Sequence, residues 1–308
     1  MEEKMDLLLK NGLVVTENEC KRVDIAVKNG KIAGLLERGS KTCCSEKEID
    51  CQGKVILPGA IDTHSHFFEP GEPSKYRDDF YTATMAAAAG GYTTCIEMPQ
   101  SIPPVVNKEA FLLKKKLATE KAVVDFALWG GLVPSSLDKI KELKEEGCVA
   151  FKAFTSDAGP DYEMCSDYDL LEGMKIVKAV GGLVGIHAEN DSICRKMTEY
   201  YRGMKTICPE YHEASRPWYA ELEAVSRCIL WSRITECPVM ICHLSIPEGA
   251  EQIKKEKEAG NKFIFAETCA HYLLFDTDTL KKYGAFARCN PPLRSPERRE
   301  KLWEYVLN

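Results

Sequence analysis

The sequence has no pair of cysteines spaced as CxxC, although it contains 14 cysteines in 308 residues. The cysteines are scattered singly through apolar segments, and the one adjacent pair, Cys43 and Cys44, falls in a polar stretch. Structural zinc sites and disulfide frameworks need closer and more regular spacing. We therefore expect most cysteines to be buried free thiols in a reducing compartment. Cys242 belongs to this group, because strand alternation would direct its side chain away from the side of His243.

The sequence also lacks an excess of positive charge and any long apolar run. Its formal net charge is −6, with acidic and basic residues interspersed, so nothing predicts a nucleic acid partner. No apolar run reaches the length of a membrane span, and the first residues, MEEKMDLLLKNG, lack the pattern of a signal peptide. With 44% apolar and 29% charged residues, the composition is that of a soluble globular protein. We expect a cytoplasmic protein with no membrane partner.

The pattern of apolar and polar residues along the sequence changes near residue 55. Before this point lie short strand-like segments with Asn-Gly pairs at residues 11–12 and 29–30, which are typical of tight turns between strands. Residues 1–54 are therefore predicted to form a small N-terminal β-sandwich module.

Residues 55–308 alternate between short apolar runs and amphipathic stretches that predict helices. Near-continuous apolar strands alternating with helices indicate a parallel sheet covered on both faces. The predicted fold class is α/β, a TIM-type (βα)8 barrel. Because the chain stops at a helical segment, SPERREKLWEYVLN, we expect this domain to be incomplete at its C-terminus after about seven βα units. The expected strands lie in VILPGAIDTH, TTCIEMP, VVDFALWGGL, CVAFKAF, LVGIHAE, VMICHLS and KFIFAETCA.

Four histidines and one lysine lie toward the C-terminal ends of these expected strands. They are His64 and His66 in DTHSH, Lys152 in AFKAF, His187 in GIHAE and His243 in ICHLS. Parallel barrel strands bring their C-terminal ends to one face, where barrel enzymes have their active sites. His64 and His66 share one side of a strand because side chains alternate, which suits two ligands of one divalent metal ion. The set predicts a metal-dependent hydrolase.

Lys152 is unusual because it would be buried within VAFKAF, and lysine is rarely buried without a partner. An ion pair with a carboxylate, or an amine that reaches solvent, would satisfy it. Alternatively, its amine reacts with carbon dioxide to form a carbamate, an anionic oxygen donor that bridges two metal ions and removes the cost of burying a cation. Beside four histidines the carbamate is favoured. Of the remaining histidines, we expect His271 to be structural and His212 to be solvated.

Several segments together resemble the cyclic amidohydrolase group of the amidohydrolase superfamily, which includes allantoinases, dihydropyrimidinases (hydantoinases) and dihydroorotases. The resemblance implies that His64, His66 and carboxylated Lys152 bind one metal ion and that Lys152, His187 and His243 bind a second. It implies two divalent ions, most often zinc, and a general-base aspartate on the eighth strand, which would lie beyond residue 308. The segments are DTHSHFFEPG, IEMPQS, AFKAF, GIHAEN, ASRPWYAELEAVSRCI, CHLSIPEG, AETCAHYLLFDTD and CNPPLRSPE.

Within this group the chain is most similar to allantoinases. Dihydroorotases usually have an arginine where this chain has Phe68, and dihydropyrimidinases usually have a tyrosine in the stretch occupied here by Thr155, Ser156 and Asp157. The implied reaction is hydrolysis of a C–N amide bond in a cyclic ureide, with allantoin to allantoate as the first expectation and dihydropyrimidinase (hydantoinase) activity as the alternative. Asn290, in CNPPLR, is then a candidate for hydrogen bonding to the ureide ring, or else a turn former before two prolines.

Two other possibilities stay open. The chain alone could be an inactive fragment, or it could be a non-enzymatic binding protein like those relatives of dihydropyrimidinase that have lost metal ligands. Asp62 is a candidate for orienting a ligand histidine or for accepting hydrogen bonds from backbone amides. The resemblance further implies a homo-oligomer, a tetramer in the family, whose small-molecule partner is a cyclic ureide.

Overall fold

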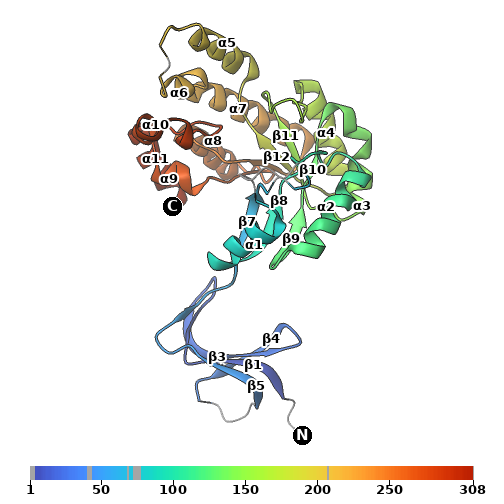
Figure 1. Cartoon of the computed structure of the whole chain (residues 1–308), viewed down its shortest axis with the longest axis vertical. Coiled ribbons are helices and arrows are strands. Elements are labelled where there is room, and N and C mark those ends of the chain that lie inside the picture. The colour runs from blue at the N-terminus through green and yellow to red at the C-terminus, as the bar shows by residue number, and fades with distance from the viewer. Residues whose placement is uncertain (1–3, 40–43, 68, 72–77, 207, 308) are drawn as a thin grey trace. The chain divides into compact units, whose positions relative to one another are not determined.

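The computed structural model describes residues 4–39, 44–67, 69–71, 78–206 and 208–307 (Figure 1). The chain forms two compact units and passes from one to the other between Ala60 and Ile61. Phe68, on which part of the subfamily argument depends, lies outside the described residues. Within the described ranges, no helix is long and apolar enough to cross a membrane.

The first unit is a six-stranded β-sheet. β1 pairs in parallel with β5 and antiparallel with β3, which also pairs with β2 and β4. The short strand β6 pairs in parallel with β2, so residues 55–56 belong to this sheet and the predicted strand VILPGAIDTH is in fact two strands. Pro58, which has no backbone N–H to donate, lies between them. The strands are β1 Met5–Lys10, β2 Leu13–Val15, β3 Cys20–Lys28, β4 Lys31–Glu37, β5 Ser45–Asp50 and β6 Val55–Ile56.

The two Asn-Gly pairs behave differently in this sheet. Asn29 and Gly30 form the two-residue turn between β3 and β4, with φ of 52° and 71°, as expected for a type I′ hairpin. Asn11 also has a positive φ, of 66°, but it links β1 to β2, which pair with β3 rather than with each other. An Asn-Gly pair therefore identified a turn in both places and a hairpin in only one.

The second unit contains parallel strands in the orders β7-β8-β9 and β10-β11-β12-β13-β14. β9 and β10 are separated only by Trp129, whose backbone N–H donates to Glu97 O at 2.9 Å, so they form one interrupted strand. The described residues thus provide the seven barrel positions that the sequence predicts, with β7 and β14 at the edges. The strands are β7 Ala60–Ser65, β8 Tyr92–Glu97, β9 Asp125–Leu128, β10 Gly130–Gly131, β11 Phe151–Phe154, β12 Val184–His187, β13 Val239–Ile241 and β14 Ile264–Ala266.

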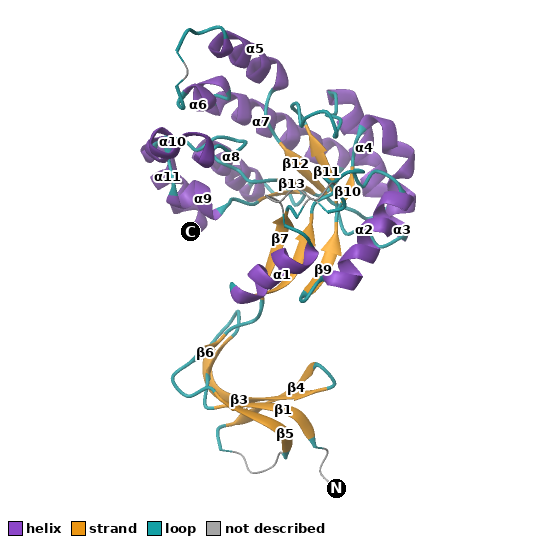
Figure 2. Cartoon of the chain, in the orientation of Figure 1, coloured by secondary structure: helices purple, strands orange, loops and turns teal. Residues whose placement is uncertain are grey.

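Helices alternate with these strands along the chain and surround them (Figure 2). Polar caps define several helix starts: Asp79 and Ser166 form capping boxes with Thr82 and Asp169, which satisfy the first backbone N–H groups. The helices are α1 Phe80–Ala89, α2 Lys108–Lys121, α3 Ile140–Glu145, α4 Asp167–Ala179, α5 Asp191–Arg202, α6 Tyr211–Ser215, α7 Trp218–Thr235, α8 Pro247–Glu258, α9 Ala270–Leu274, α10 Thr277–Tyr283 and α11 Pro296–Leu307, with short 3₁₀ helices η1 Pro134–Lys139 and η2 Gly284–Ala287.

The core of the second unit lies between the strands and the helices that cover them. Every residue of β11 and β12 is buried, because these strands are covered on both faces, and this is why their sequences read as continuous apolar runs. Phe151 and Ile186 from the strands pack in one cluster with Leu170 and Met174 from α4. This packing fixes the strands, and therefore the positions of the side chains at their C-terminal ends.

Many of the cysteines are buried, as the sequence predicts. Of the 13 cysteines that the structure describes, eight are buried free thiols, from Cys51 in the first unit to Cys242 in the second. Burial raises the pKa of Cys148, Cys165 and Cys228 to about 12, because a thiolate is poorly solvated in an apolar interior. These cysteines therefore act as small apolar residues.

Candidate metal centre

The five residues singled out in the sequence lie around one cavity of about 1510 Å³. His64 belongs to β7 and His66 follows it, Lys152 is the second residue of β11, His187 ends β12, and His243 comes two residues after β13. The strands therefore deliver all five side chains to the same end of the barrel, as parallel strands must.

The four histidines form two pairs of facing ring nitrogens. His64 Nε2 lies 3.1 Å from His66 Nε2, and His187 Nδ1 lies 3.2 Å from His243 Nε2. Two nitrogens that bind one tetrahedral zinc ion at roughly 2.0–2.1 Å are about 3.3 Å apart. The ring centroids of His64 and His243 are only 5.3 Å apart, so the two pairs adjoin. Each pair has the spacing of two ligands of one ion.

Lys152 is completely buried. Its Nζ has no hydrogen-bond partner among the described residues and lies 5.0 Å from the centroid of the Phe154 ring. The ion pair considered above is therefore not formed by the described carboxylates. A buried amine without a partner is costly, whereas a carbamate at the same position would place anionic oxygens beside the histidine pairs. His243 Nδ1 is likewise buried and unpaired within the described part of the chain.

The electrostatics of the cavity keep the imidazoles neutral. Desolvation within the cavity lowers the pKa of His66 and His243 well below the ordinary value, and the nearby Lys152 amine and neighbouring rings lower it further. Burial also lowers the pKa of His64 and His187, although a carboxylate beside each opposes the shift. Neutral imidazole is the form that binds metal ions. The donor set and the unpaired Lys152 amine therefore fit a centre of two divalent ions.

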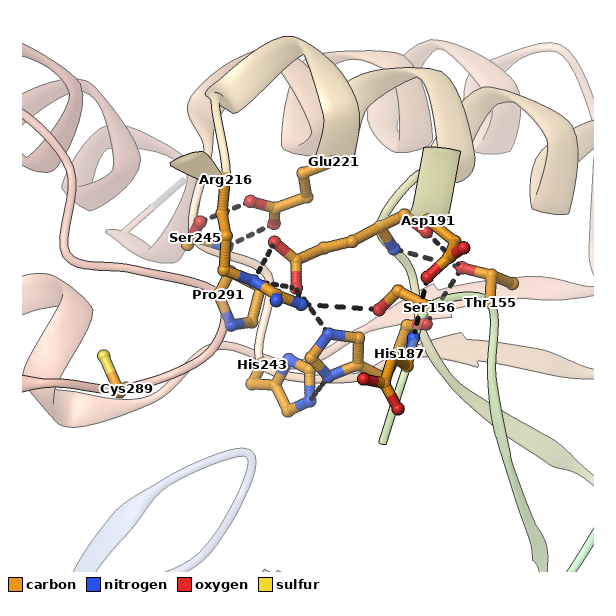
Figure 3. A network of polar contacts seen from close by, with 12 residues as sticks. Thr155, Ser156, His187, Asp191, Arg216, Glu221, His243, Ser245, Cys289 and Pro291 are labelled. Atoms are coloured by element: carbon orange, nitrogen blue, oxygen red, sulfur yellow. Dashed lines mark hydrogen bonds and ion pairs between the residues drawn. The ribbon is translucent and has the colours of Figure 1, made fainter. Parts of the chain in front are cut away.

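Two glutamates that the sequence analysis missed lie behind the histidine pairs. Glu267, just after β14, contacts His64 Nδ1, and Glu189, two residues after β12, accepts a hydrogen bond from His187 Nε2 at 2.6 Å. Burial opposes ionisation of Glu189, yet the hydrogen bond with His187 and the charge of Arg216 lower its pKa to about 2. Figure 3 shows this polar network around His187 and His243. In the sequence, the position of Glu189 two residues after His187 could have identified it as a partner of that histidine. No sequence feature identifies Glu267.

Cys242 contradicts the sequence expectation. Its Sγ lies within 4.8 Å of a ring nitrogen of His64 and a carboxylate oxygen of Glu267, so the thiol faces the barrel interior beside the site. The reason is the backbone: β13 ends at Ile241, and His243 has a φ of 40°. Strand alternation therefore no longer applies at residues 242–243.

The other candidates take different places. Asp62 Oδ1 accepts from the backbone N–H of His64 at 3.0 Å, which is the second of its two expected roles. His212 is half-buried and its Nε2 lies 2.7 Å from Cys289 O, so the expectation of a solvated side chain is wrong. His271 also lines the cavity, and its Nε2 has no described partner. Asn290 lines the cavity as well and is exposed.

Comparison with known proteins adds the family context. Residues 55–270 match the profile of the amidohydrolase family. The allantoinases of Escherichia coli O9:H4 (strain HS) and Escherichia coli (strain K12) are 36% identical over 309 residues, which covers 98% of this chain and 67% of each relative.

Solved structures agree with the sequence relatives. L-hydantoinase (dihydropyrimidinase) from Arthrobacter aurescens superposes with a TM-score of 0.92 at 32% identity, covering 98% of this chain and 66% of that one. Dihydropyrimidinase from Brevibacillus agri NCHU1002 gives 0.87 at 27% identity, with the same coverage of 98% and 66%. The chain thus spans about two thirds of the length of the proteins it matches. The resemblance and the barrel fold predicted from the sequence are both confirmed.

Proposed function

The chain belongs to the amidohydrolase family, and on this premise we propose that it carries the metal centre for hydrolysis of a C–N amide bond in a cyclic ureide. One observation carries the proposal. Two pairs of histidines, with ring nitrogens 3.1 and 3.2 Å apart within each pair, lie around the same cavity as the unpartnered amine of Lys152. Allantoin, opened to allantoate, is the proposed substrate, because allantoinases match 98% of the chain at 36% identity. Hydantoinase activity is the second candidate, because L-hydantoinase gives a TM-score of 0.92.

Each proposed ligand has a defined part in this reaction. His64 and His66 would hold one ion, His187 and His243 the other, and Lys152 as a carbamate would bridge them. The ions, when bound, supply an activated hydroxide and polarise the amide carbonyl. Zinc is the proposed metal, since imidazole nitrogens with an oxygen donor suit it.

The chain's own residues around the cavity would bind and orient the ring. Asn290 lies on the cavity wall, and its amide can both donate to a ureide carbonyl and accept from a ureide N–H. Glu189 and Glu267 face the ring nitrogens that point away from the metal positions, so neither is placed to act as a general base. The proposal therefore leaves proton transfer to the aspartate that the family resemblance assigns to an eighth strand, outside residues 1–308.

The remaining proposals concern the setting of the protein. We propose a cytoplasmic location, because eight buried free thiols suit a reducing compartment. A homo-oligomer, a tetramer by resemblance, is proposed on family grounds alone. The possibility of a non-enzymatic binding protein is disfavoured, because such relatives have lost metal ligands and all five candidate positions here are occupied by ligand residues.

The test is metal analysis combined with turnover. The purified chain is loaded with zinc and bicarbonate, its bound metal is measured by elemental analysis, and allantoin, hydantoin and dihydrouracil are supplied as substrates. About two ions per chain with opening of allantoin supports the proposal. Bound metal without turnover by this chain identifies an inactive fragment that retains the metal centre. Absence of bound metal overturns the proposal for this chain.

A further inference from the structure

His187 has a carboxylate on the far side of its ring. Its Nδ1 faces His243 Nε2 at 3.2 Å, while its Nε2 lies 2.6 Å from Glu189 Oε2. The side chains of His187 and Glu189 are only 5% and 0% exposed. A ring nitrogen that donates to a carboxylate carries the proton, so the opposite nitrogen keeps its lone pair. Glu189 thus selects the tautomer in which Nδ1 is available to a metal ion.

Arg216 in turn holds Glu189. Its Nε donates to both carboxylate oxygens of Glu189, at 3.1 and 3.0 Å, and its Nη2 reaches Ser156 Oγ at 3.4 Å. An arginine that grips a carboxylate at several points fixes its orientation as well as its charge. Because Glu189 is completely buried, Arg216 is also the cation that balances its charge.

A buried arginine in turn holds Arg216. Arg294, 2% exposed, donates from Nη1 to the backbone oxygen of Arg216 at 2.6 Å. Its other nitrogens donate to Glu221 Oε2 and Ser245 Oγ, both at 2.9 Å. Arg294 lies four residues after Asn290, in the segment CNPPLR. A continuous chain of buried or partly buried polar contacts therefore joins His187 to the segment that carries Asn290.

We propose that Glu189 is a positioning residue for His187 and that Arg216, anchored by Arg294, holds it in place. The inference rests on the proposed function only in requiring a metal ion at the His187–His243 pair. Its consequence is that affinity for the ion at this pair depends on a carboxylate that does not itself bind the ion. Carboxylates behind metal-bound histidines typically change metal affinity by about 10–100-fold.

The test compares Glu189→Gln with Asp276→Asn in the complete chain. The two carboxylates are matched: both are buried, at 0% and 8% exposure, and both pair with a partly exposed arginine. Only Glu189 touches a histidine of the centre. Zinc affinity is measured by competition with a chelator, and stability by thermal unfolding of the metal-free protein.

We expect Glu189→Gln to weaken one of the two zinc sites by about 10–100-fold. Asp276→Asn should leave both affinities unchanged, whatever its effect on the unfolding temperature. Glu189→Asp, which keeps the charge, should recover part of the lost affinity. Unchanged affinity in Glu189→Gln, or an equal loss in Asp276→Asn, overturns the inference.

A milder variant keeps the test decisive if Glu189→Gln does not fold. Arg216→Lys retains the positive charge but loses the multipoint grip on Glu189, so it should weaken the same zinc site by a smaller factor; unchanged affinity overturns the inference. Because zinc affinity is measured without substrate, the result is independent of ureide turnover. If the variants bind zinc more weakly than the wild type as expected, but no ureide is hydrolysed, the inference stands and the proposed function fails. A wild-type chain that binds no zinc overturns both.

Discussion

Glu267 is the carboxylate partner of His64: it contacts Nδ1 of the ring, while Nε2 of the same ring faces His66 Nε2 at 3.1 Å. Thr63 Oγ1 donates to the other oxygen of Glu267 at 3.2 Å and so fixes the carboxylate. The two histidine pairs are thus built alike. In each, a glutamate that follows a strand contacts one ring at the nitrogen that faces away from the other histidine.

Glu267→Gln should therefore weaken zinc at the His64–His66 pair by about 10–100-fold, because the uncharged amide holds the ring less firmly. Chelator competition with the purified protein measures the effect. Glu251→Gln, on the exposed surface of α8, is the control and should leave the affinity unchanged. Equal affinities in both variants would show that Glu267 has no part in the centre.

Lys152→Met should remove the bound metal and all ureide hydrolysis without unfolding the protein. The methionine has a similar length and fills the same buried space, while the unpartnered amine disappears along with its desolvation cost. The metal-free variant should unfold at the same or a higher urea concentration than the wild type. Full metal content in Lys152→Met is the result that contradicts the bridging role.

Reconstitution of the metal-free protein should need carbon dioxide as well as zinc. A carbamate forms only from the neutral amine and carbon dioxide, so zinc added in carbonate-free buffer should restore a small part of the activity and of the bound metal. Adding bicarbonate should restore the rest. Recovery that is equally complete in both buffers would favour Lys152 as a plain amine.

Lys114→Met should destabilise the second unit by about 3–5 kcal/mol. Lys114 and Glu97 form a completely buried ion pair at 3.0 Å, and removal of the lysine leaves the charge of Glu97 buried without this counterion. Urea unfolding measures the loss. Lys116→Met, on the exposed face of the same helix α2, is the matched control and should have no measurable effect, since exposed ion pairs contribute little.

Most of the candidate site could be predicted because it depends on local rules. The placement of His64, His66, Lys152 and His187 follows from alternation within strands and from the parallel arrangement of those strands, both of which are visible as apolar runs. The tertiary partners could not be predicted in this way. Glu267 is 203 residues from His64 in the sequence, and only the tertiary structure brings them together.

Two of the failed predictions, those for Cys242 and for VILPGAIDTH, share a cause in the backbone. Strand alternation predicts that the Cys242 side chain points away from the site, but the rule fails there because His243 adopts a φ of 40°. The apolar pattern of a strand does not reveal such a backbone change. The predicted strand at VILPGAIDTH is divided because its first residues find a partner in β2 of the other unit. In both cases a conformation set by the tertiary structure replaces the local rule.

The buried thiols of the folded protein should react slowly with alkylating reagents, in contrast to the exposed Cys20. Only the thiolate attacks such reagents, and with a pKa of about 12 at Cys148, Cys165 and Cys228 roughly one thiol in 10,000 is ionised at pH 8. Labelling must therefore await a transient opening that exposes the sulfur to water. Cys148 lies before β11, Cys165 after it and Cys228 within α7. Their individual labelling rates, measured by mass spectrometry, therefore report how fast different parts of the barrel open.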